Sequence, residues 1–148
     1  MSLRTTPTNI EDNKMSQLRI QVIMPDKKKL DEYIDLAVMP GADGDFEVQE
    51  GHAPFITMLR PGTMRTQKNG KSEYYAIHEG FVSVENNNIM ILSEICEEKS
   101  EIVLNRAVLA KERAEERMKS KTSDSDIEFR RAENALKKAL TRISTANN

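Results

Sequence analysis

The spacing of apolar residues in this 148-residue chain changes once, near Ser100, and that change constrains the fold more than any other feature. Before Ser100, apolar and polar residues alternate, a pattern typical of half-buried strands. After Ser100, the apolar residues recur at every third or fourth position, as on one face of a helix. We therefore predict a β domain over residues 17–99, followed by a helical domain over residues 100–148.

The first domain is expected to be an antiparallel β-sandwich or flattened barrel, because it holds many short apolar runs separated by turn signals. Asn69-Gly70 is the strongest of these signals, since both positions accept the positive φ angles of a two-residue hairpin. Pro40-Gly41 is predicted as another turn. The predicted strand runs are Leu18–Met24, Ile34–Val38, Phe46–Val48, Phe55–Leu59, Thr63–Gln67, Glu73–His78, Phe81–Val84 and Ile89–Leu92.

Two helices are expected in the second domain, joined by the polar link at residues 123–126 into an antiparallel hairpin. Their apolar faces are rich in alanine, which buries little area but has the highest helix propensity. The sequence agrees equally well with a hairpin that opens and with one that stays docked. The two predicted apolar stripes are Val103, Ala107, Ala110, Ala114 and Met118, and then Ala132, Ala135, Leu136, Ala139, Leu140 and Ile143.

Composition narrows the class of function. The chain has 22 basic and 24 acidic residues, a balance that argues against a dedicated nucleic-acid binder. Its single cysteine excludes an internal disulfide framework, and no segment approaches the roughly 20 apolar residues that span a bilayer. We expect a soluble intracellular protein, with residues 1–16 forming a disordered arm or an artificial extension.

No group of residues has the spacing of a catalytic or metal site. Gly70-Lys71-Ser72 resembles the end of a phosphate-binding loop, but Arg65 stands where that loop needs a glycine. The two histidines, His52 and His78, and the lone Cys96 lack the spacing of zinc ligands. We therefore expect a protein without catalytic residues or metal, in which His52 makes a structural hydrogen bond in a turn and His78 is an ordinary strand residue.

The last helix carries basic residues that no acidic residue balances beyond Glu133. Basic side chains near a helix C-terminus complement the helix dipole, which explains them without any partner. The alternative explanation is an acidic protein surface that this helix binds. The residues concerned are Arg130, Arg131, Lys137, Lys138 and Arg142.

Read in order, short motifs along residues 17–146 resemble the epsilon subunit family of F-type ATP synthases. Each motif is short, but their order and spacing together are specific to that family. The motifs are Met39-Pro40-Gly41, Gly44-Asp45, Gly51-His52-Ala53-Pro54, Leu59-Arg60-Pro61-Gly62, Gly80-Phe81-Val82-Ser83-Val84, Arg106-Ala107, Ala110-Lys111-Glu112-Arg113-Ala114-Glu115, Asp126-Ile127-Glu128-Phe129 and Arg131-Ala132-Glu133.

The resemblance implies a non-catalytic rotor subunit with an N-terminal β-sandwich and a C-terminal helical hairpin. It implies a place in the central stalk, bound to the gamma subunit and resting on the ring of c subunits. In such a complex the chain would be peripheral to the energy-transducing membrane, on its inner face and on the cytoplasmic side in a bacterium. The family residues that match Asp45 and His52 lie on the surface that meets the ring.

The resemblance also implies a regulatory role for the hairpin. In many bacterial members of the family the hairpin extends and blocks ATP hydrolysis, with its basic second helix facing an acidic segment of the catalytic β subunit. The residues that would make this contact are Arg130, Arg131, Lys137, Lys138 and Arg142.

Some family members bind ATP on the hairpin through the pattern Ile/Leu-Asp-x-x-Arg-Ala. Ile102, Arg106 and Ala107 match that pattern, and Arg113 is a further candidate for contacts to phosphate. Val103 replaces the aspartate and cannot accept a hydrogen bond from ribose or from the adenine amine. We therefore expect no cofactor.

Two other functions remain as alternatives to the rotor subunit. One is an ATP-sensing module whose hairpin closes on the nucleotide, which titration calorimetry with ATP would detect. The other is an adaptor that grips an unrelated acidic protein through the basic hairpin. Co-purification from native membranes would distinguish an adaptor from a synthase subunit.

Overall fold

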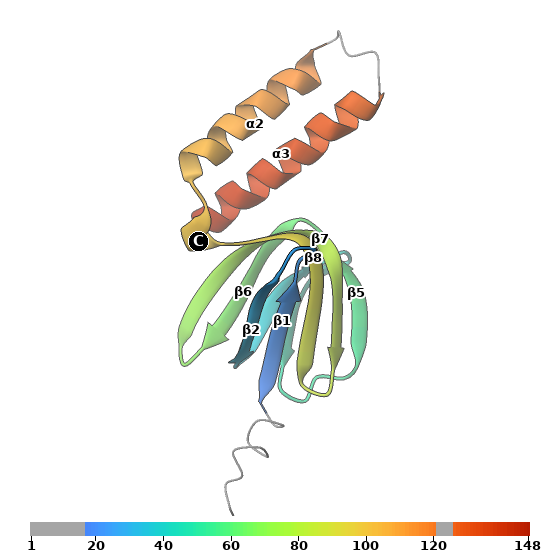
Figure 1. The fold of residues 1–148 in the computed structure, drawn as a ribbon, viewed down its shortest axis with the longest axis vertical. Coiled ribbons are helices and arrows are strands. Elements are labelled where there is room, and N and C mark those ends of the chain that lie inside the picture. The colour runs from blue at the N-terminus through green and yellow to red at the C-terminus, as the bar shows by residue number, and fades with distance from the viewer. Residues whose placement is uncertain (1–16, 121–125) are drawn as a thin grey trace, which may run out of the picture.

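The computed structural model describes residues 17–120 and 126–148, and it shows a β-sandwich with a helical hairpin lying across one end (Figure 1). The fold class predicted from the sequence is therefore confirmed. The strands are β1 (Leu18–Ile23), β2 (Lys28–Ile34), β3 (Leu36–Gly41), β4 (Gly44–Gln49), β5 (Phe55–Leu59), β6 (Gly62–Lys68), β7 (Lys71–Glu85) and β8 (Asn88–Glu98). A 3₁₀ turn, η1 (Lys99–Glu101), leads into the helices α2 (Leu104–Lys119) and α3 (Asp126–Ala146).

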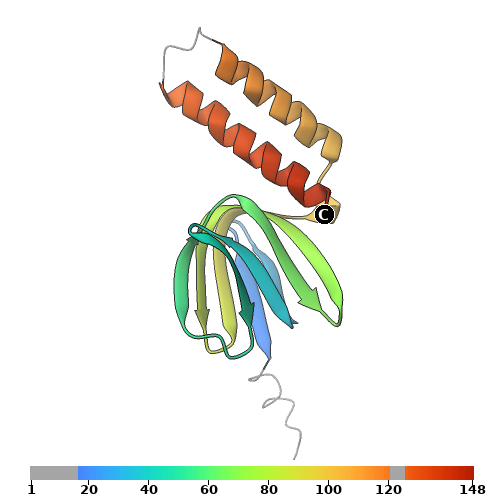
Figure 2. The same cartoon turned by 180° about the vertical axis from the view of Figure 1, so that it is seen from behind.

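The strands form one sheet that folds over into two layers (Figure 2). Their order is β2-β1-β8-β7-β5-β3-β4, and β6 pairs with both β3 and β7. The 15-residue strand β7 joins the layers, because its first half pairs with β6 and its second half with β5. Among the described strands, β1 and β8 form the one parallel pair. Strand β4 lies at one edge of the sheet.

The space between the layers is filled by aliphatic side chains and methionines from nearly every strand. Ile20, Met39, Met64, Ile77 and Ile91 are fully buried there. Burying side chains of this size contributes about 1.5–3 kcal/mol each. Because these residues belong to residues 17–99, the sandwich has a hydrophobic core to which the helices contribute nothing.

Of two turns predicted from the sequence, one is confirmed and one is wrong. Asn69 and Gly70 have φ angles of 51° and 77°, so the predicted hairpin between β6 and β7 is confirmed. The predicted turn at Pro40-Gly41 is wrong, because both residues belong to β3 and the turn follows at residues 42–43. A side chain at position 41 would meet the ring of Phe46 at 2.9 Å, so this glycine is needed for close packing.

Two predicted strand boundaries are also wrong. The run Ile34–Val38 is divided between β2 and β3, since the chain bends at Asp35 and both strands then pair with different neighbours. The runs Glu73–His78 and Phe81–Val84 are instead parts of the single strand β7. Glu79 joins them with a φ angle of 42°, a left-handed conformation that is uncommon for glutamate.

Alanines form the contact between the helices, as the sequence predicted. The buried ones are Ala107 and Ala114 of α2 and Ala132 and Ala139 of α3. Val103 and Leu140, which were also predicted on these stripes, are instead 52% and 45% exposed. Near its C-terminus α3 buries threonines, since this end packs against β6 and β7 as well as against α2.

Candidate functional site

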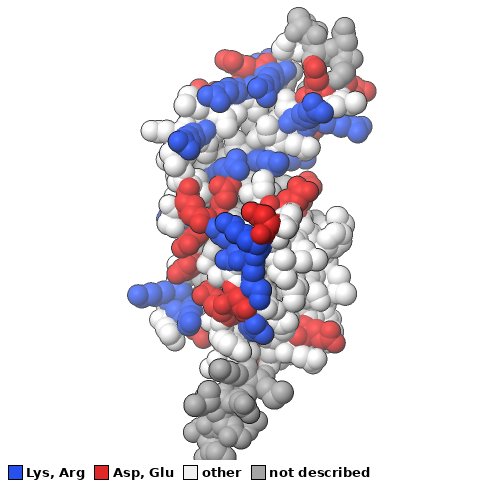
Figure 3. All heavy atoms as spheres, viewed as in Figure 1, with Lys and Arg blue, Asp and Glu red and all other residues white. Residues whose placement is uncertain are grey.

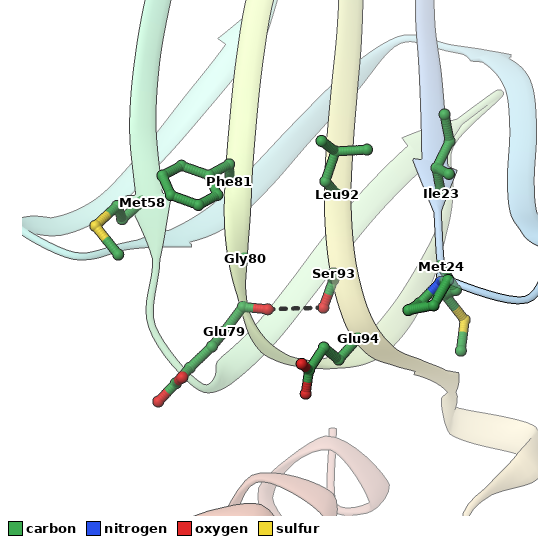
Figure 4. Close-up of a pocket in the computed structure, with 10 residues that line it drawn as sticks. Ile23, Met24, Met58, Glu79, Gly80, Phe81, Leu92, Ser93 and Glu94 are labelled. Carbon is green, nitrogen blue, oxygen red and sulfur yellow. Dashed lines mark hydrogen bonds between the residues drawn. The ribbon is translucent and has the colours of Figure 1, made fainter.

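An apolar row on the outer face of the sandwich crosses four strands. Met58 of β5, Phe81 of β7, Leu92 of β8 and Ile23 of β1 are direct cross-strand neighbours (Figure 4). The first three side chains are 55%, 54% and 50% exposed. The row borders a shallow cavity of about 480 Å³. Large side chains grouped this way on a surface typically mark a contact with another protein.

Polar and acidic groups close one end of the apolar row. The Ser93 hydroxyl donates a hydrogen bond of 2.9 Å to the backbone carbonyl of Glu79 (Figure 4). Gly80 allows β7 and β8 to approach here, because an added Cβ would lie 2.2 Å from the carbonyl oxygen of Leu92. Glu79 and Glu94 are among the residues that line the cavity at this end of the row. A complementary partner would therefore combine apolar residues with at least one basic residue.

Asp45 lies at the end of the sandwich that carries the hairpin. Its Oδ1 pairs with Nη2 of Arg60 at 2.5 Å, and the other guanidinium nitrogen of Arg60 donates to the carbonyl of Gly41. Arg60 and Asp45 line a polar cavity of about 470 Å³ that also contacts Ser144 and Asn148, beside the C-terminal end of α3. Both side chains of the ion pair stay substantially exposed, so Asp45 is available to a partner.

His52 lies in the loop after β4, at the opposite end of that strand from Asp45. Its Nδ1 is 2.7 Å from the carbonyl oxygen of Ala53, and its ring packs edge-on against Phe55. At roughly 3.3 Å per residue, the four steps along β4 from Asp45 to Gln49 span about 13 Å. His52 follows in the turn, where its N–H donates to the carbonyl of Gln49. The structure therefore does not bring the two residues together, and any surface that includes both must run along the edge strand β4.

The five basic residues of α3 do not form a single free surface. Figure 3 shows basic side chains along the hairpin and a wide uncharged area on the sandwich. Arg130 and Arg131 are exposed in the half of α3 that lies away from the sandwich. Arg142 donates through Nε to Glu97 of β8 at 2.7 Å, whereas Lys137 and Lys138 line a small cavity between α3 and the sandwich.

The residues predicted to bind nucleotide are spread over the start of α2 and the segment before it. Ala107 is buried against α3, whereas Arg106 and Arg113 are exposed. Ile102 is partly buried before the helix begins. Val103 is the N-cap residue of α2 and makes no side-chain capping bond. An aspartate here would accept a hydrogen bond from the first turn, so α2 lacks a side-chain cap at this end.

A buried polar cluster joins the hairpin to the sandwich, and sequence reasoning missed it. His78 of β7 is only 3% exposed, and its Nε2 lies 3.7 Å from Oε1 of Glu97, the oxygen that Arg142 binds. The neighbouring His78 imidazole and Arg142 guanidinium hold the pKa of the Glu97 carboxyl below its usual range, against the opposing effect of burial. Thr63 and Thr145 add a hydrogen bond of 2.8 Å between β6 and α3.

The described residues include neither a helix suited to crossing a bilayer nor a cluster of metal-binding side chains. No helix in residues 17–120 and 126–148 is both long and apolar enough to cross a bilayer. Over the same ranges, no three side chains among His, Cys, Asp and Glu are grouped so that they could hold a metal ion.

Both parts of the chain match one family of known proteins. Residues 17–99 match the β-sandwich domain of the ATP synthase delta/epsilon chain, and residues 100–147 match its long α-helix domain. The chain belongs to this family. The resemblance read from the sequence motifs is therefore confirmed.

Relatives in this family are similar over nearly their whole length. The "ATP synthase epsilon chain" of Desulforamulus reducens is 42% identical over 128 residues, which cover 86% of this chain and 96% of the relative. The protein of the same name from Citrifermentans bemidjiense is 40% identical, over 88% of this chain and 94% of the relative. The one from Bacillus velezensis is 34% identical, over 90% of this chain and 100% of the relative.

Solved structures share the fold at lower sequence identity. A chain of the Euglena gracilis mitochondrial ATP synthase, in a structure of OSCP, F1 and the c-ring, superimposes with a TM-score of 0.77 at 21% identity. The alignment covers 90% of this chain and 82% of that one. A chain in a structure of the central stalk and c-ring of the Tetrahymena thermophila mitochondrial ATP synthase superimposes with a TM-score of 0.57 at 13% identity. This alignment covers 88% of this chain and 94% of that one.

Proposed function

We propose that this chain is a non-catalytic rotor subunit of an F-type ATP synthase, which couples the c-ring to the catalytic head and restrains ATP hydrolysis through its hairpin. The observation that carries the proposal is a sandwich with its own core joined to a hairpin by a small polar contact. A partner can therefore bind the sandwich while the hairpin moves. Family membership and the synthase structures of similar fold support this role.

The apolar row supports a contact with the gamma subunit. A stalk subunit must stay attached to its neighbour while it transmits torque, which favours an apolar contact with a few charged residues. Met58, Phe81 and Leu92 supply the apolar part, and Glu79 and Glu94 supply the charges at its end.

The edge strand β4 supports the contact with the c-ring. Asp45 and His52 flank this strand at its two ends, so a contact along β4 includes both of the residues that the family resemblance indicates. In this arrangement the chain would lie on the cytoplasmic side of a bacterial membrane, held there by its partners.

Docking of the hairpin is weak enough for a regulatory movement. The side chains that α3 buries are Ala132, Ala139, Thr141 and Thr145, none of them large and apolar. Side-chain links between α3 and the strands include the hydrogen bond of Thr145 to Thr63 and the ion pair of Arg142 to Glu97. A net contribution of about 1 kcal/mol for the first and 1.5–3 kcal/mol for the second is modest. In the undocked form, all five basic residues of α3 become available to an acidic segment of the catalytic β subunit.

The test is ATP hydrolysis by a catalytic complex reconstituted with the full chain or with a chain ending at Lys99. We expect truncation to raise the rate, and the double substitution R130E/R131E to raise it in the same direction. R117E/K119E, at two exposed basic residues in the last turn of α2, is the matched control and should leave the rate unchanged. Binding to the complex without any change in rate on truncation would refute the inhibitory role, whereas failure of both chains to bind would refute the rotor role.

The alternative ATP-sensing module gains no support from the part of the chain that the structure describes. Val103 is exposed and its side chain carries no acceptor, and two cavities that border both the sandwich and the hairpin are lined by residues other than Arg106 and Arg113. Calorimetric titration with ATP remains the direct test of that alternative.

A further inference from the structure

Two cavities on the sandwich share part of their walls. The apolar row borders a cavity of about 480 Å³, and a second cavity of about 150 Å³ lies between the sandwich and α3. Glu79 of β7 and Glu94 of β8 line both of them. These two side chains lie between the apolar row and the helix in Figure 4. The surface that fits a stalk partner therefore adjoins the surface that holds the hairpin.

The register of β7 and β8 places Glu79 and Glu94 opposite each other. The backbone pairing is interrupted at this point, where Glu79 has a φ angle of 42° and its carbonyl accepts the Ser93 hydroxyl instead. Like charges directly opposite on neighbouring strands are unfavourable. Within residues 17–120 and 126–148, no basic side chain forms an ion pair with either glutamate. A cation that comes beside this acidic pair is therefore favoured.

The docked helix α3 brings two lysines to the same acidic pair. Lys137 and Lys138 line the second cavity together with Glu79 and Glu94. Part of the charge of Lys137 is offset within the helix, because its Nζ lies 3.9 Å from Oε1 of Glu133. Exposed charge pairs are weak, and each changes an equilibrium by about 1.5- to 5-fold. The acidic pair therefore contributes a modest attraction that holds α3 on the sandwich.

A partner on the apolar row meets the acidic pair from the other side. Met58, Phe81 and Leu92 supply the apolar contact, and the two glutamates at the end of the row favour a lysine or arginine of the partner. That cation and the lysines of α3 would repel each other and compete for the same acidic residues. Binding at the row and docking of α3 then weaken each other by the same factor.

We propose that the partner of the apolar row places a basic side chain at Glu79 and Glu94, and that its binding loosens the docked hairpin. The expected change in the docking equilibrium is about two- to fivefold, the effect of losing one or two exposed charge pairs. This inference deepens the proposed function, on which it rests for the identity of the partner as the gamma subunit. The assembled stalk would then hold the hairpin more weakly than the free chain does, which favours the form that restrains hydrolysis.

The first test uses the isolated full chain and builds the partner's cation into the sandwich as E94K. Undocking is measured as the rate at which a thiol reagent labels T145C, because Thr145 is fully buried in the docked form. We expect E94K to raise this rate about two- to fivefold, and K137E/K138E added to E94K to restore it. E85K, at an exposed residue at the far end of β7, is the matched control and should leave the rate unchanged.

The second test adds the gamma subunit to the T145C chain. Saturating gamma subunit should raise the labelling rate, and E79Q/E94Q should both weaken its binding and remove that rise. A labelling rate that E94K leaves unchanged would overturn the linkage whether or not the gamma subunit binds. Equal affinity of the gamma subunit for E79Q/E94Q and for the unsubstituted acidic pair would overturn the basic contact. Failure of the gamma subunit to bind any of these chains would instead count against the proposed function.

Discussion

A disulfide between positions 63 and 145 should lock the hairpin onto the sandwich and abolish its effect on hydrolysis. The hydroxyl oxygens of Thr63 and Thr145 are 2.8 Å apart, so sulfur atoms in T63C/T145C would lie close enough to bond. Competition from Cys96 is not expected, because burial raises the pKa of its thiol to about 12.

The expected changes in free energy follow from the hydrogen bond between Thr63 and Thr145, which the two cysteines replace. In the reduced variant the lost hydrogen bond costs about 1 kcal/mol, which shifts the docking equilibrium about fivefold toward the undocked form. Oxidation then closes a loop spanning 82 residues, and the lost entropy of the unfolded chain amounts to about 4.5 kcal/mol. The oxidised variant should therefore stay docked and unfold at a higher temperature than the reduced one.

The assay is ATP hydrolysis by the reconstituted complex, measured with oxidised and with reduced T63C/T145C. We expect the oxidised form to match the chain that ends at Lys99, and the reduced form to inhibit at least as strongly as wild type. T63C and T145C alone, oxidised in the same way, control for effects of oxidant. Equal inhibition by the locked and reduced forms would show that the hairpin does not need to leave the sandwich.

Three further predictions test other parts of the structure. V103D should stabilise α2 by about 1 kcal/mol in thermal unfolding, because aspartate supplies the missing N-cap acceptor; a lower melting temperature would contradict the assigned cap. E79G should raise the melting temperature, since a left-handed conformation costs a side-chain-bearing residue about 1–2 kcal/mol. E85G, on the same strand without a positive φ, should lower it, and equal effects of the two would refute the strain at Glu79. The pKa of Glu97 is lowered in the folded chain, so its contribution to stability is complete above its ordinary value of 4.5 and is lost as the pH falls through the lowered value. Acid unfolding of E97Q should therefore show a shallower loss of stability in that range than wild type.

The sequence was sufficient for the fold class because each domain repeats one period many times. Alternation marks one face of each strand, and the alanine spacing marks the contact between the helices, so neither depends on knowing what lies elsewhere in the chain. The turn at Asn69-Gly70 could be predicted equally well, because its positive φ angles depend on these two residues themselves. Leu140 was wrongly placed for the opposite reason: what α3 buries near its C-terminus is decided by its contact with β6 and β7, which no helical period encodes.

The junction around His78 was not predictable from the sequence. Glu97 and Arg142 are 45 residues apart, and only the docking of α3 brings them together. His78 reads as an ordinary strand residue until the helix covers it. The apolar row was hidden for a related reason, because alternation shows that Met58, Phe81 and Leu92 occupy one face of their strands but not whether that face points into the core.

The charge division between the two domains has a direct consequence for regulation. Residues 100–148 carry 11 basic and 8 acidic side chains, and one of the basic residues, Arg142, is already bound to Glu97. While α3 is docked, Nε of Arg142 donates to Glu97 and the side chain is only 30% exposed, so an acidic partner gains full access to this guanidinium only in the undocked form. Docking to the sandwich and binding to an acidic partner are therefore competing equilibria. A substitution of Glu97 that weakens this pair and leaves Arg142 intact should strengthen the binding of the hairpin to its partner by up to the same free energy.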